Sequence, residues 1–216
     1  MRRSLAVIVV IGWSCLCAGC GVGTSATAST TSASATRFTP AGYQALRAYL
    51  RFGNRLHNEP GLTLAKIDRM RPLCRQLGPN SVDLEVQGIR AVCASALKVA
   101  GGLVEIRVCD TLVESAQRPC AVKAFQLFAS GEEQGVAAEN GILQILGGGP
   151  CYTFMNEGVP QDRRLLAVTD QLVAALDSDS VTRQLLSSWQ HALNVDLGTE
   201  PSLAAEAKRA KACQPV

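Results

Sequence analysis

The stretch VDLEVQGIRAVCASALKVAGGLVEIRVCDTLV, residues 82–113, decides the fold class. Its first half carries apolar residues every three or four positions, which predicts one buried helix face. These residues are Val82, Val86, Ile89, Val92, Cys93 and Ala96. In the second half a strand competes, because Val104, Ile106 and Val108 alternate with charged residues. No second alternating run follows the N-terminal segment, so such a strand would have no partner, and the sequence predicts helix.

Gly101-Gly102, in the middle of this stretch, is expected to form a tight turn between two antiparallel helices. Cys93 lies about eight positions before the turn and Cys109 about eight after it. The two cysteines would then face each other, and a Cys93–Cys109 disulfide would stabilise the hairpin by roughly 2–4 kcal/mol. A helix that continued through the glycines would instead separate them by ~24 Å, beyond the reach of a disulfide.

Helical periodicity continues along the rest of the chain. The sequence therefore predicts an all-α fold, a single disulfide-stapled helical bundle of about six to eight helices. Clusters of turn residues are expected to separate these helices at 58–61, 78–81, 130–131 and 147–150. Thr63 and Ser180 are expected to cap helices, Pro72 to kink or divide one, and Pro119 and Pro201 to open others.

The N-terminus begins with Arg2-Arg3, continues through the apolar run Leu5 to Leu16, and reaches Cys17-Ala18-Gly19-Cys20. This order resembles the export signal of a bacterial lipoprotein, although a leucine is expected where Cys17 stands. The resemblance implies cleavage before Cys20 and anchoring through lipid on Cys20 to the outer face of the cell membrane. Two alternatives stay open: ordinary cleavage near residues 26–28, which would give a secreted protein, and an uncleaved anchor over residues 5–22.

This interpretation divides the chain into three parts. Residues 1–19 are the predicted signal peptide. Residues 20–40 are the lipidated cysteine and a tether composed almost entirely of Gly, Ser, Thr and Ala, which lacks the apolar content needed to fold. As a flexible coil this tether spans on the order of 25 Å. Residues 41–216 are the predicted helical domain.

Six cysteines remain after the signal and Cys20 are set aside. They are Cys74, Cys93, Cys109, Cys120, Cys151 and Cys213. An even number in an oxidising compartment predicts three disulfides, and beyond Cys93–Cys109 the pairing stays open. Zinc sites use closely spaced cysteine pairs, whereas the smallest spacing here is eleven positions. The sequence therefore predicts disulfides and no metal site.

Charge and motifs exclude several classes of function. Arg2 and Arg3 account for two of the 21 basic residues, which leaves 19 against 18 acidic residues. A nearly neutral domain argues against a nucleic-acid partner, because neutralising phosphates requires a basic surface. The chain lacks the GxSxG, GxGxxG, GxxxxGK[ST] and HExxH motifs. No catalytic residue and no cofactor is therefore expected.

A few side chains stay as weaker candidates. Glu132 and Glu139 lie seven positions apart on one helix face and could serve acid–base chemistry, although a solvated face explains them as well. His57 and His191 are expected at the surface or at a helix end. A loop over residues 151–160 could present aromatic side chains to a ligand or cover the core. Its candidates are Tyr152, Phe154, Met155 and Asn156.

Three functions are compatible with this sequence. The first is a membrane-anchored lipoprotein of the cell envelope, a non-enzymatic binding or scaffolding module whose partner is an envelope protein or a small ligand. The second is an envelope enzyme that uses carboxylates such as Glu132 and Glu139. The third is a carrier of a small apolar ligand, held in a cavity between helices.

Overall fold

The computed structural model describes residues 38–78, 80–146 and 153–199, and within these ranges it contains helices and turns but no strand. Six helices follow one another within these ranges. They are α1 (Pro40–His57), α2 (Leu64–Arg75), α3 (Leu84–Cys109), α4 (Glu114–Leu146), α5 (Thr153–Asp177) and α6 (Arg183–Thr199). The predicted all-α class is therefore confirmed for the described residues.

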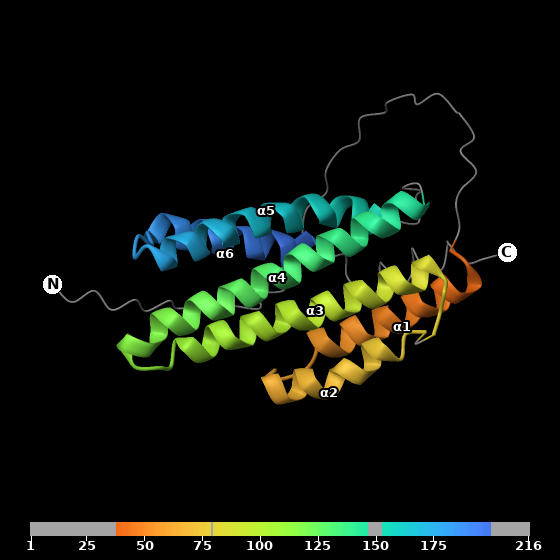
Figure 1. Cartoon of the computed structure of the whole chain (residues 1–216), viewed down its shortest axis with the longest axis horizontal. Helices are drawn as coiled ribbons and strands as arrows, with labels where there is room; N and C mark the ends of the chain where they lie inside the picture. The colour runs from red at the N-terminus through yellow and green to blue at the C-terminus, as the bar shows by residue number, and fades with distance from the viewer. Residues whose placement is uncertain (1–37, 79, 147–152, 200–216) are drawn as a thin grey trace, which may run out of the picture.

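The two longest helices, α3 and α4, form an antiparallel pair through the middle of the molecule (Figure 1). Helices α1 and α2 lie on one side of this pair, and α5 and α6 lie on the other. The turn between α3 and α4 extends past the ends of α1 and α2. This protruding turn sets the position of the candidate site described below.

Buried apolar side chains form two clusters that share α3 and α4. The first cluster joins α1, α2, most of α3 and Ile142 of α4, with Leu46 and Ile67 almost fully buried. The second joins the end of α3 to α4, α5 and α6 around Trp189, which is 1 % exposed. Phe125 and Phe128 meet the Trp189 ring edge to face, at centroid distances of 5.0 and 5.8 Å.

The predicted turn at Gly101-Gly102 is wrong, because α3 runs through both glycines without a break. Gly102 lies against α4, where an added Cβ would be 2.7 Å from the Phe128 amide nitrogen. Gly131 has the reciprocal role, since a Cβ there would be 2.8 Å from the Val99 nitrogen. These glycines let the backbones of α3 and α4 approach closely. The predicted break at 130–131 is also wrong, because α4 runs through both residues without interruption.

The predicted Cys93–Cys109 disulfide is wrong for the same reason: both cysteines lie on one continuous helix. Cys93 is instead bonded to Cys74, which joins α2 to α3 with a Cα–Cα distance of 5.6 Å. Cys109 is bonded to Cys120, which joins α3 to α4 with a Cα–Cα distance of 5.5 Å. Each bridge therefore connects neighbouring helices across a turn.

Several helix boundaries follow the predicted capping chemistry. The Thr63 hydroxyl accepts from the Lys66 amide at the start of α2, as expected. At α6, however, Thr182 rather than Ser180 accepts from the Leu185 amide. Pro72 lies inside a continuous α2.

The other predicted boundaries fall differently. Helix α4 begins at Glu114, five residues before Pro119, which it contains in its second turn. Residues 153–160 are the start of α5 rather than a loop. The helix expected after Pro201 lies outside the described residues. Among the described helices, none combines the length and the hydropathy that crossing a membrane requires.

Candidate functional site

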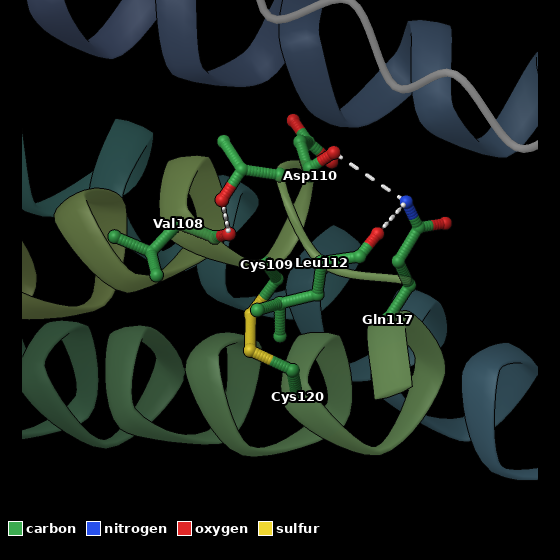
Figure 2. Close-up of a disulfide and its surroundings, with 7 residues drawn as sticks. Val108, Cys109, Asp110, Leu112, Gln117 and Cys120 are labelled. Carbon is green, nitrogen blue, oxygen red and sulfur yellow. Dashed lines mark hydrogen bonds between the residues drawn. A yellow bond between two sulfur atoms is a disulfide. The ribbon is translucent and has the colours of Figure 1, made fainter. Parts of the chain in front are cut away.

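The turn between α3 and α4, residues 110–113, is called the tip. Its backbone is held by a disulfide at its base and by hydrogen bonds with residues of α3 and α4 (Figure 2). The Cys109–Cys120 disulfide closes its base. The Thr111 hydroxyl donates to the Val108 carbonyl over 2.7 Å. From α4, the Gln117 amide donates to the Leu112 carbonyl over 2.9 Å and to the Asp110 carbonyl over 3.4 Å.

Large apolar side chains are exposed on and beside this fixed tip. Val113 is 72 % exposed and Leu112 is 38 % exposed, and Val108 in the last turn of α3 is 49 % exposed. Burying one such side chain completely is worth about 1.5–3 kcal/mol. Because the tip backbone is already ordered, a partner that covered it would lose little of this gain to conformational entropy.

A groove of about 420 Å³ lies next to the tip, between the N-terminal end of α2 and the last turns of α3. Its walls are mostly apolar, and Leu62, Leu64, Val104 and Val108 contribute to them. Leu64 is itself 40 % exposed. Because Val108 and Thr111 also line the groove, the groove and the tip form one continuous apolar surface.

Charged groups border this surface on two sides. Arg107 lines the groove, and no ion pair within the described part of the chain involves it. Asp110, the first residue of the tip, and Glu114, which directly follows the tip, are both exposed. Although the residue is exposed, desolvation of its carboxyl group raises the pKa of Asp110. The groove is thus bordered by a positive charge and the tip by negative ones.

The carboxylates singled out from the sequence lie about two turns apart on one helix. Glu132 and Glu139 both lie on α4, where seven residues correspond to a rise of ~10.5 Å along the axis. Glu132 is 7 % exposed rather than solvated, and Glu139 is half-buried. Over the described ranges, no group of three or more His, Cys, Asp or Glu side chains is arranged to hold a metal ion.

A different acidic pair, Asp162 of α5 and Asp196 of α6, does lie in contact. Burial, a hydrogen bond with Asp162 and the charge of Asp162 raise the pKa of Asp196 to about 8. A carboxyl group that stays protonated near neutral pH can donate a hydrogen bond or a proton. The two residues are 34 positions apart on separate helices, so no local sequence pattern indicated the pair.

A third buried carboxyl, Glu85 of α3, is only 4 % exposed and joins α3 to the start of α1. Its Oε2 accepts from the Thr39 backbone amide over 2.9 Å. Desolvation raises the pKa of Glu85 despite this bond. Gly42 leaves the room for it, because a Cβ there would overlap Oε2. The contact is an interhelical cap of α1, so Glu85 has a structural role.

The remaining predicted candidates are scattered. His191 is exposed on α6, and His57 is the last residue of α1. Cys20, Cys151, Tyr152 and Cys213 lie outside the described residues, so lipidation and the third disulfide stay predictions. The side chains of Phe154, Met155 and Asn156 also lie outside the description. The tip and groove were not found from the sequence, because Leu112 and Val113 continue the apolar pattern of a helix face.

Comparisons with protein-family models, with curated proteins and with solved structures gave no match for this chain.

Proposed function

We propose that the chain is a membrane-anchored module of the cell envelope that binds a partner through the tip and the groove. The observation that carries this proposal is the exposure of Leu112 and Val113 on a backbone fixed by the Cys109–Cys120 disulfide, beside an apolar groove. Exposed apolar side chains that gather in one patch are typical of interaction surfaces. The anchoring part follows from the lipoprotein-like signal and Cys20.

The binding part is tested by photo-crosslinking in cells that export the full chain. A benzophenone side chain introduced at Val113 should give covalent adducts on illumination. The matched control is Val82, which is 91 % exposed just before α3, at the opposite end of that helix. Equal yields from the two positions, or no adduct from Val113, would contradict the proposed binding surface.

The anchoring part is tested separately, with an alkyne analogue of a fatty acid supplied to the same cells. The wild-type chain should take up this label and sediment with membranes, and Cys20→Ala should not be labelled. A wild-type chain that sediments with membranes without label would point to an uncleaved apolar anchor, and one that is released would point to ordinary secretion.

A second function, carriage of a small apolar molecule, is favoured by the volume of the groove, which lies in the range of ligand pockets. The groove is open along one side, so a bound molecule would keep part of its surface in water. Extraction of the purified full chain should then release an apolar molecule that is absent from an Ala65→Trp variant, whose larger side chain fills the groove. An identical extract from both variants would exclude carriage in this groove.

A further inference from the structure

The tip and the groove match in their apolar character. The tip extends past the ends of α1 and α2 (Figure 1) and carries the exposed side chains of Leu112 and Val113, whereas the groove is a hollow with apolar walls such as Leu64 and Val104. The tip of one chain cannot enter its own groove, because it follows directly after Val108 and its backbone is fixed by the disulfide and by Gln117. Any tip that fills the groove must therefore come from another molecule.

The two halves are also complementary in charge. Arg107 borders the groove, whereas Asp110 and Glu114 lie at the two ends of the tip, and within the described residues of one chain these groups form no ion pair. Opposite charges placed across an interface favour one arrangement of partners over others. A partner for this groove therefore needs an apolar protrusion flanked by acidic groups, and the tip itself has this composition.

We propose that the groove receives the tip of a second copy of this chain, so that two copies pair about a two-fold axis. Such an interface is isologous: each tip enters the other groove, and each Arg107 meets the acidic residues of the other tip. The inference rests on the proposed role of this surface in binding and names its partner. Copies anchored in one membrane would meet at high effective concentration, so a modest affinity would suffice.

The first test measures the mass of the full chain, solubilised in detergent, by light scattering with correction for the detergent. The wild type should be a dimer whose dissociation constant rises about tenfold or more on Val113→Asp, because a charge would then enter the apolar groove. Val82→Asp, at the far end of α3, should leave it unchanged. Thermal unfolding of each variant shows that the fold is kept.

The second test exchanges the charges between two differently tagged chains. Arg107→Glu alone would place acids opposite acids, and the double variant Asp110→Lys, Glu114→Lys alone would place bases opposite bases, so each should be monomeric. A mixture of the two has attraction at both ends of the interface, and should form a dimer that contains both tags. No heterologous partner or nonspecific apolar contact predicts recovery on mixing.

The outcomes separate this inference from the proposed function. A monomeric wild type, or a mixture that stays monomeric, would overturn the pairing of two copies. If Val113 then still gave crosslinks to a different protein, the binding surface would stand and only its partner would change. If Val113 gave no crosslinks at all, both proposals would fall.

Discussion

Gly102 of α3 lies against the backbone of Phe128 in α4, so closely that an added Cβ would be 2.7 Å from the Phe128 nitrogen. At the adjacent Gly101 the nearest atom to a Cβ would be Leu127 Cδ2, at an ordinary 3.8 Å. We expect Gly102→Ala to lower the free energy of unfolding by about 1–3 kcal/mol, because the helices must separate.

Gly101→Ala is the matched control for this prediction. It should leave the free energy of unfolding unchanged or raise it by up to about 1 kcal/mol, because alanine favours helix. Urea denaturation measures both values. Equal losses in the two variants would show that the helices do not approach at Gly102 as described.

The same glycines show what the sequence could and could not predict. Apolar periodicity is a local property, so it correctly predicted helices on both sides of Gly101 and the all-α class. The contact of Gly102 with Phe128 joins residues 26 positions apart, and a glycine that permits such packing looks the same in sequence as one that ends a helix. The wrong turn then led to the wrong partner for Cys93.

The candidate surface was hidden for a related reason. Leu112 and Val113 have the composition of a buried helix face, and only the turn of the chain at the tip leaves them exposed. The Asp162–Asp196 contact likewise depends on how α5 packs against α6. The spacing of residues within either helix does not indicate that packing. Capping, by contrast, depends on neighbouring residues, so the role of Thr63 could be predicted.

The two observed disulfides leave one possible pairing for the expected third disulfide. With Cys74 bonded to Cys93 and Cys109 bonded to Cys120, the predicted mature chain leaves Cys151 and Cys213 for each other. Peptide mapping of the exported protein without reduction should recover all three pairs. Recovery of Cys151 or Cys213 as a free thiol would contradict the three-disulfide prediction, and a Cys93–Cys109 peptide would contradict the arrangement of α3.

The indole N–H of the buried Trp189 has the hydroxyl group of Thr169 as its hydrogen-bond acceptor. Its indole Nε1 donates to Thr169 Oγ1 over 3.0 Å, and that hydroxyl donates to the Leu165 carbonyl over 2.8 Å. Thr169→Val should lower the free energy of unfolding by about 1–3 kcal/mol, because it leaves the indole N–H buried without an acceptor. Thr169→Ser keeps the hydroxyl group and should lower the free energy of unfolding by less than Thr169→Val does. If the two variants lost equal stability, the methyl group rather than the hydrogen bond would matter.

The Asp162–Asp196 pair predicts a pH dependence of stability. The pKa of Asp196 rises from its ordinary value of 3.8 to about 8 in the folded chain, so the unfolded chain releases this proton more readily. Its contribution to the free energy of unfolding is then complete below about pH 4, declines as the pH rises toward 8, and is lost above that value. Asp196→Asn cannot ionise, so this variant should gain stability over the wild type as the pH rises from 5 to 9.

Thermal unfolding across this pH range measures that difference, because titration of the groups outside the Asp162–Asp196 pair is common to both proteins. The control is Asp170→Asn, which removes one exposed carboxyl group from the same helix α5. A difference between Asp196→Asn and the wild type that stayed constant from pH 5 to pH 9 would mean that Asp196 is ionised throughout. In that case the two carboxyl groups share no proton, and α5 and α6 hold no protonated carboxyl group at neutral pH.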